Sequence, residues 1–257
     1  MSSHMPKHLT AFDVAAVYHK PLIQLVAEAH AVHLQNFKLG EVQTSQLLSI
    51  KTGGCPENCS YCPQSAHYDT GVEKQKLLSV SEVTKAAKLA KENGATRFCM
   101  GAAWREVKDG PEFDRVLEMV STVKGLGLET CCTLGMLNET QAVKLKEAGL
   151  YAYNHNIDTS EENYQNIIST RTFADRIRTI ENVRKAGMTV CTGGILGLGE
   201  NDHDRASFIA RLANFSPQPE SVTINTLVPI AGTPLENQNK IDPLTVIRVI
   251  ATARIFM

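Results

Sequence analysis

The stretch KTGGCPENCSYCPQS, Lys51 to Ser65, places three cysteines within eight residues. Cys55, Cys59 and Cys62 follow a C-x3-C-x2-C spacing, and clustered thiolates are typical ligands of zinc or of iron–sulfur clusters. Zinc modules usually add a second ligand pair, but no second C-x2-C element is present. His67 stays open as a fourth zinc ligand. The spacing favours an iron–sulfur cluster with three protein ligands and one iron open to a small molecule.

Outside this loop, apolar runs and amphipathic segments alternate along the chain. We expect strands within 45–54, 95–103, 128–135, 152–158, 188–196 and 221–229, and helices within 79–94, 110–127, 138–149, 172–187, 201–215 and 242–257. Six successive βα units predict a parallel sheet, and they favour a TIM-type (βα) barrel over a doubly wound sheet. A closed barrel of this type has eight units, so we expect a barrel truncated after about six.

Composition narrows the remaining possibilities. The net charge of −1 and the apolar fraction of 43% give no sign of a nucleic-acid or membrane-surface partner. Seven cysteines in 257 residues predict reduced thiols and a cytoplasmic protein. Residues 1–12 resemble the remnant of an expression tag, and residues 13–257 form one expected barrel domain. Its first part, 13–40, is an expected helical segment that Pro21 interrupts.

The other cysteines all fall within expected strands. They are Cys99, Cys131, Cys132 and Cys191. Successive residues of a strand face opposite sides, so only one of Cys131 and Cys132 can face the barrel interior. Two interpretations stay open: three of these thiols form a second metal or cluster site, or they are buried packing residues.

A second group of candidates is polar. Asn154, Asn156 and Asp158 alternate along the strand expected at 152–158 and would share one face. A polar face indicates a ligand cavity, although Asp158 alone could cap the following helix. Asn225 and Arg176 pose the same choice between a cavity and a solvent-exposed surface. The glycine-rich loop 193–200 is a weak signal for ligand binding and lacks the dinucleotide fingerprint.

These residues resemble a known family. CPENCSYC resembles the cysteine motif of the radical S-adenosylmethionine (SAM) superfamily, and Tyr61 is the aromatic residue before its last cysteine. RFCMGAAWRE, ETCCTLGML, YNHNIDTS, TRTFADRI and CTGGILGLGE extend the likeness to the biotin synthase family, from about Val14 to the last residue.

The resemblance implies a sulfurtransferase with two clusters. Cys55, Cys59 and Cys62 would hold a [4Fe–4S] cluster that cleaves S-adenosylmethionine, and the resulting radical would act on dethiobiotin. Sulfur would come from a [2Fe–2S] cluster held by Cys99, Cys131 and Cys191; the ETC pattern selects Cys131 over Cys132. The family's fourth ligand, an arginine, would follow Met257 together with two further barrel units.

The resemblance also assigns the polar residues and the partners. Asn156 and Asn225 would contact dethiobiotin, with Asn154 beside it at the cofactor. Cofactor contacts would come from Asp158 (ribose), Arg176 (carboxylate end), Gly193 and Gly194 (backbone), and Tyr61 (adenine). An electron donor of the flavodoxin or ferredoxin type and a homodimer are expected. The alternatives are another radical SAM barrel enzyme acting on a small molecule, or a non-enzymatic electron-transfer or structural metal-binding protein.

Overall fold

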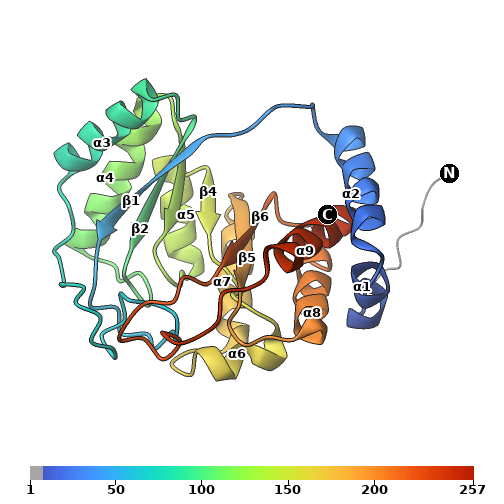
Figure 1. Cartoon of the computed structure of the whole chain (residues 1–257). Helices are drawn as coiled ribbons and strands as arrows, with labels where there is room; N and C mark the ends of the chain where they lie inside the picture. The colour runs from blue at the N-terminus through green and yellow to red at the C-terminus, as the bar shows by residue number, and fades with distance from the viewer. Residues whose placement is uncertain (1–7) are drawn as a thin grey trace.

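A computed structural model describes residues 8–257 and shows one sheet of six parallel strands in the order β1-β2-β3-β4-β5-β6. Each strand pairs with the next strand along the chain, and every pairing is parallel. This order is that of a barrel built unit by unit, and β1 and β6 form the two sheet edges (Figure 1). The strands are β1 Ser45–Lys51, β2 Arg97–Ala102, β3 Glu129–Thr133, β4 Ala152–Asn154, β5 Thr189–Leu196 and β6 Ser221–Thr226.

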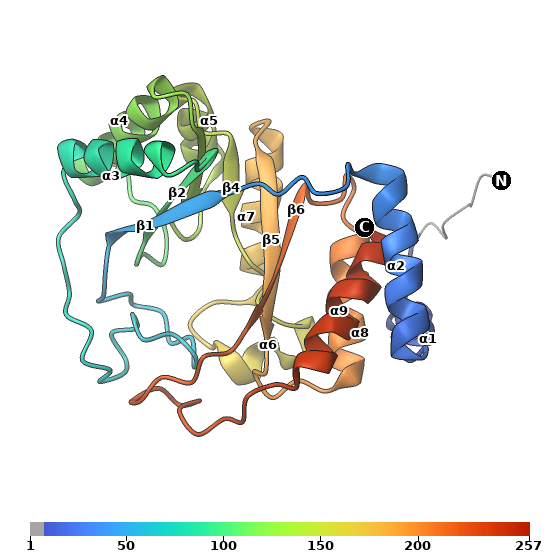
Figure 2. The same ribbon diagram turned by 45° about the horizontal axis from the view of Figure 1, so that its top comes forward.

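Helices join the strands and pack on the outer side of the curved sheet, while α1 and α2 pair with α8 and α9 beside the β6 edge (Figure 2). The curved sheet with its outer helices is a half-barrel, which confirms the expected TIM-type class with six units. The helices are α1 Ala11–Tyr18, α2 Leu22–Asn36, α3 Val80–Glu92, α4 Pro111–Gly125, α5 Glu139–Ala148, α6 Glu161–Ile167, α7 Phe173–Lys185, α8 Asp202–Ala213 and α9 Pro243–Phe256.

Local sequence fixes where many helices begin. Thr10, Ser79, Asn138, Thr172 and Asn201 each cap a helix and form a reciprocal capping box with the residue three positions later. Such boxes satisfy two backbone N–H groups that the helix itself leaves unpaired. The loops before these helices therefore end at defined residues.

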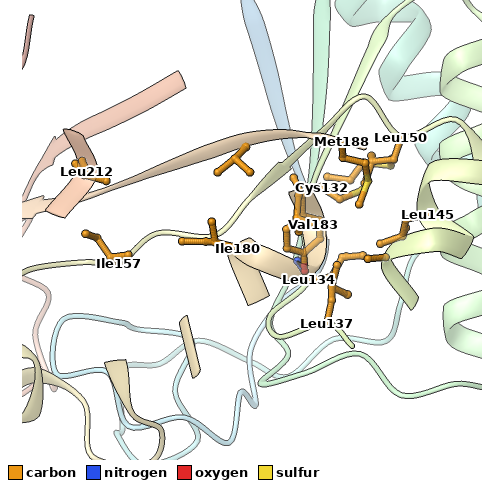
Figure 3. Packing of buried hydrophobic residues seen from close by; sticks show 14 of the residues in the cluster. Cys132, Leu134, Leu137, Leu145, Leu150, Ile157, Ile180, Val183, Met188 and Leu212 are labelled. Atoms are coloured by element: carbon orange, nitrogen blue, oxygen red, sulfur yellow. Dashed lines mark hydrogen bonds between the residues drawn. The ribbon is translucent and has the colours of Figure 1, made fainter. Parts of the chain in front are cut away.

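The main core lies between the sheet and its outer helices. Cys132 belongs to this core and is fully buried; Figure 3 shows it near Val183, Leu150 and Met188. Cys131 precedes it in β3 and points to the opposite, concave side of the sheet. The structure therefore resolves the choice that strand alternation alone left open: Cys132 is the packing thiol.

Three details differ from the sequence-based expectation. The fourth strand ends at Asn154 instead of Asp158, and Asp158 has a φ of 67°. Helix α6 was not predicted. Residues 1–7 of the tag-like start lie outside the described part, but Leu9 is buried and Thr10 caps α1, so ordered structure begins before residue 13. Pro21 separates α1 from α2, as expected. Within residues 8–257 no helix has both the length and the apolar character needed to cross a bilayer.

Candidate active site

The cysteine loop follows β1 at the carboxyl end of the sheet, where barrel enzymes place their active sites. Its backbone folds back on itself. The Cys55 N–H donates to Gln64 O at 2.9 Å, Ala66 N–H donates to Cys55 O at 2.7 Å, and Cys62 N–H donates to Cys59 O at 2.9 Å. These bonds bring the two ends of the cysteine motif together and make the loop a compact unit.

The same loop is fastened to the segment that follows α6. Asn58 Oδ1 accepts from the backbone N–H groups of Ser169 (3.0 Å) and Thr170 (3.2 Å), and Asn58 Nδ2 donates to Ser169 Oγ at 2.7 Å. Ser60 donates from both its backbone N–H and its hydroxyl to Ile167 O. The cysteine loop after β1 is therefore held in position by the end of α6 and the segment that follows it.

A pocket of about 190 Å³ opens above this loop. A larger hollow of about 310 Å³ lies between β6 and α9, but it contains none of the predicted site residues. We place the site in the smaller pocket because thiols, carboxylates, amides and guanidinium groups converge there. Its lining includes Cys55, Glu57, Cys59, Tyr61, Cys62, Asn154, His155, Asn156, Asp158, Arg171 and Arg176.

The three loop thiols suit a bound cluster. Burial raises the pKa of Cys55 and of Cys62, while backbone N–H groups of Glu57, Gln64 and Ser65 act in the opposite direction by donating to these sulfurs. Burial raises the pKa of Cys59 to about 12, and the Asp158 charge adds to the effect. N–H donors aimed at sulfur stabilise thiolate ligands, and a bound metal displaces the thiol protons. The residues present therefore fit a cluster held by three cysteines.

A single metal ion does not fit as well. In residues 8–257 no group of three His, Cys, Asp or Glu side chains is close enough to hold one ion. In a cubane cluster each thiolate binds a different iron, so the sulfurs need not converge on one point. His67 Nε2–H donates to Pro56 O at 3.0 Å, and His67 is absent from the lining of the pocket. The structure therefore does not support the zinc alternative with His67.

Asp158 and Arg176 form a buried ion pair on the pocket wall. Arg176 Nη2 donates to Asp158 Oδ2, and Arg176 Nε donates to Tyr164 Oη at 2.9 Å. Both side chains are only 3–6% exposed. Although burial alone favours the neutral form, the charge of Asp158 raises the pKa of Arg176, so this guanidinium stays charged. A ligand bound here would meet one carboxylate and one guanidinium held in fixed positions.

The deeper thiols gather on the concave side of the sheet. Cys99 and Cys131 are register partners in β2 and β3. A hydrogen bond with Cys131 lowers the pKa of Cys99, and the same bond raises that of Cys131, the donor. Cys191 lies on the same face two strands away, and the residue between them at the level of Cys131 is Ala152. Ala152 and Cys191 both line a pocket of about 200 Å³ on this side of the sheet.

Asn154 connects the deep thiols to the pocket. Its Nδ2 donates to Cys191 Sγ at 3.2 Å and lies 3.4 Å from Asn156 Oδ1. Asn156 Oδ1 also accepts from Thr223 Oγ1 at 2.9 Å. Two of the three polar residues predicted on one face thus form a polar path from the pocket to Cys191, and Asp158 lines the pocket beside them.

Gly193, Gly194 and Asn225 lie away from the pocket lining. A Cβ on Gly193 would lie 1.8 Å from Thr223 O, and a Cβ on Gly194 would lie 2.3 Å from Asp158 O. These glycines therefore allow β6 and the Asp158 backbone to approach β5. Asn225 is exposed in β6, opposite Ile195. Direct ligand contacts for these three residues stay predictions.

Residues that the sequence did not single out complete the site. Arg171 is 8% exposed and its Nη2 lies 3.8 Å from Cys59 Sγ, while Glu57 is 2% exposed. Thr170 Oγ1 donates to Glu57 Oε2. Glu57 and Asn58 stand inside the cysteine motif, and that position was the available signal for both. Thr170 and Arg171 begin the stretch TRTFADRI that contributes to the family resemblance. Their individual roles had no signal, because those roles depend on contacts with a distant loop.

Comparison with known proteins agrees with this geometry. The family model described as "Radical SAM superfamily" matches residues 49–212, and the model described as "Biotin and Thiamin Synthesis associated domain" matches residues 223–257. A biotin synthase of Flavobacterium johnsoniae is 56% identical over 257 residues, which are 100% of this chain and 71% of the relative. A biotin synthase of Myxococcus xanthus is 58% identical over 245 residues, 95% of this chain and 71% of the relative.

Among solved structures, methylornithine synthase matches with a TM-score of 0.81 at 21% identity, covering 97% of this chain and 73% of that one. A maturase of the [FeFe]-hydrogenase matches with a TM-score of 0.82 at 15% identity, covering 97% of this chain and 58% of that one. At these identities the likeness concerns the fold alone.

Proposed function

This chain belongs to the biotin synthase family of the radical S-adenosylmethionine superfamily, and we propose that it inserts sulfur into dethiobiotin to form biotin. One observation carries the proposal: Asn154 joins a pocket lined by three clustered thiols to a second thiol site at Cys191. A radical source and a sulfur source must both reach the substrate. A substrate bound along the polar path between the two thiol sites would lie within reach of both.

Cys55, Cys59 and Cys62 would hold a [4Fe–4S] cluster, which supplies the electron that cleaves S-adenosylmethionine to methionine and a 5′-deoxyadenosyl radical. Cys99, Cys131 and Cys191 would hold a [2Fe–2S] cluster, which supplies the sulfur. The chain's own residues orient the two small molecules and exclude water, so that the reacting carbon and the radical meet directly.

Asp158 and Arg176 suit the cofactor. The carboxylate of Asp158 can accept hydrogen bonds from ribose hydroxyls, and the guanidinium of Arg176 can pair with the cofactor's carboxylate. Their mutual ion pair holds both groups before the ligand arrives. Tyr61 lines the same pocket, consistent with a place beside the adenine. Backbone groups of Gly193 and Gly194 would also contact the cofactor, and the lack of a side chain at Gly194 allows the Asp158 backbone to lie against β5.

Asn156 and Asn225 suit the substrate. Amide groups can donate to and accept from the cyclic urea of dethiobiotin. Asn156 lines the pocket and accepts a hydrogen bond from Thr223 in β6. Asn225 is two residues beyond Thr223 and lies on the same face of that strand. Asn154 lies between cofactor, substrate and Cys191. We also propose a cytoplasmic homodimer that receives electrons from a flavodoxin or ferredoxin type of protein.

Anaerobic reconstitution with iron and sulfide tests the proposal. The protein should bind both, and with dithionite, S-adenosylmethionine and dethiobiotin it should release 5′-deoxyadenosine and biotin, measured by mass spectrometry. Cys55→Ala should release neither product. Release of 5′-deoxyadenosine with another substrate but never with dethiobiotin would favour a different radical SAM enzyme. A protein that binds zinc and cleaves no cofactor would overturn the proposal.

A further inference from the structure

Arg171 is a buried cation that the proposed reaction does not use. It lies between α6 and α7, lines the pocket, and is only 8% exposed. Its Nη2 lies 3.8 Å from Cys59 Sγ, within hydrogen-bonding reach of sulfur. Burying a charge costs free energy unless a partner compensates it. The partners of Arg171 therefore decide how much of its charge acts on Cys59.

The nearest anion compensates Arg171 incompletely. Glu57 Oε1 lies 3.9 Å from Arg171 Nε and 3.5 Å from Arg105 Nη1. Within the described residues neither Glu57 Oε1 nor Arg171 Nε has a hydrogen-bond partner. Arg176, by comparison, donates directly to the carboxylate of Asp158. Arg171 therefore retains hydrogen-bonding capacity and positive charge directed at Cys59.

The segment around Arg171 is held in place independently of any ligand. The Asn58 side chain accepts from Ser169 and Thr170 immediately before Arg171, and Thr172 immediately after it caps α7. Arg171 consequently has a fixed backbone position relative to the cysteine loop. Its contact with Cys59 follows from this arrangement of two loops.

We propose that Arg171 is a positioning residue that raises the reduction potential of an iron–sulfur cluster held by Cys55, Cys59 and Cys62. Reduction adds negative charge to a cluster, and a nearby cation with an N–H group on a ligand sulfur stabilises the reduced form. Glu57 has the opposite effect and limits how far the potential rises. The inference rests on the proposed function, because it requires that cluster.

A redox titration followed by electron paramagnetic resonance tests this inference, since the signal reports only clusters that are loaded. In Arg171→Gln we expect a lower midpoint potential, with a reduced-to-oxidised ratio about tenfold smaller at a fixed solution potential, or about 59 mV for one electron. Glu57→Gln should shift the potential upward. Arg171→Lys, which keeps the charge, should lie between Arg171→Gln and the unmodified protein. Arg178→Gln on the exposed side of α7 should leave the potential unchanged.

The outcomes separate this inference from the function on which it depends. Loaded Arg171→Gln clusters with an unchanged midpoint potential would overturn it, while release of biotin by the unmodified protein would leave the proposed function standing. If Arg171→Gln loads no cluster, the opposite shifts expected for Glu57→Gln and Arg171→Lys still decide it. Failure of the unmodified protein to load any cluster would overturn the proposed function itself.

Discussion

The amide of Asn154 donates to the thiol of Cys191 across a distance of 3.2 Å, and the same side chain lines the pocket above the cysteine loop. The two residues are opposite each other in β4 and β5. Because the Asn154 side chain contacts both the ligand pocket and a proposed cluster ligand, a displacement of either one would also displace the other. This single contact connects the two halves of the proposed chemistry.

Replacing Asn154 with alanine should weaken the second cluster site. The variant loses the N–H group that contacts Cys191, and loss of such a supporting group typically lowers metal affinity about tenfold or more. Iron and sulfide content together with the visible absorption spectrum would measure the loss. Asn166→Ala removes an exposed amide of α6 and is the matched control. Full retention of both clusters in Asn154→Ala would contradict this role.

The cysteine loop should depend on Asn58 for its stability. Asn58→Ala leaves the N–H groups of Ser169 and Thr170 without their acceptor, a loss worth about 1–3 kcal/mol of unfolding free energy. Asn58→Asp keeps the accepting oxygen and should cost less. Anaerobic urea unfolding would measure both variants. The exposed Asn36 bonds only to Val32 O in its own helix, so Asn36→Ala should change stability little; equal losses in both alanine variants would refute the assignment.

Local signals explain which features the sequence could predict. The alternation of strands and helices and the cysteine spacing are encoded over short stretches, and both were recovered. Helix α6 was missed because its seven residues are too few for a clear period. Asn58 and Ser169 are 111 positions apart, and Arg171 meets Cys59 across a similar gap. Such contacts depend on how two loops meet at the mouth of the sheet, which periodicity cannot indicate.

The polar residues after β4 illustrate a partly correct inference. Strand alternation predicted that Asn154, Asn156 and Asp158 share a face, but regular strand ends at Asn154. All three nevertheless line the pocket. The chain reaches this result through a left-handed turn at Asp158, whose backbone pairs with Gly194. The prediction of a common cavity was right, and the geometry assumed for it was wrong.

Gly194 should be intolerant of any side chain. A Cβ there would lie 2.3 Å from Asp158 O and 2.8 Å from Phe208, so Gly194→Ala must displace the backbone that positions Asp158. We expect a loss of about 1–3 kcal/mol or more and weaker binding of S-adenosylmethionine, measured by thermal unfolding and calorimetry. Gly125 at the end of α4 has open space around it, so Gly125→Ala should be neutral or slightly stabilising. Normal stability and binding in Gly194→Ala would show that β5 and Asp158 can separate freely.

Cys131 and Cys132 are neighbours with opposite surroundings, and their alanine variants should differ in kind. Cys132 is fully buried in the core, so Cys132→Ala should cost about 1 kcal/mol of stability through lost packing and should leave both cluster spectra unchanged. Cys131→Ala should remove the [2Fe–2S] absorption and preserve the [4Fe–4S] signal, because it faces Cys99 on the concave side. Each variant is the control for the other. Loss of the [2Fe–2S] spectrum in Cys132→Ala, with its retention in Cys131→Ala, would contradict the assignment of Cys131 to the cluster site and of Cys132 to the core.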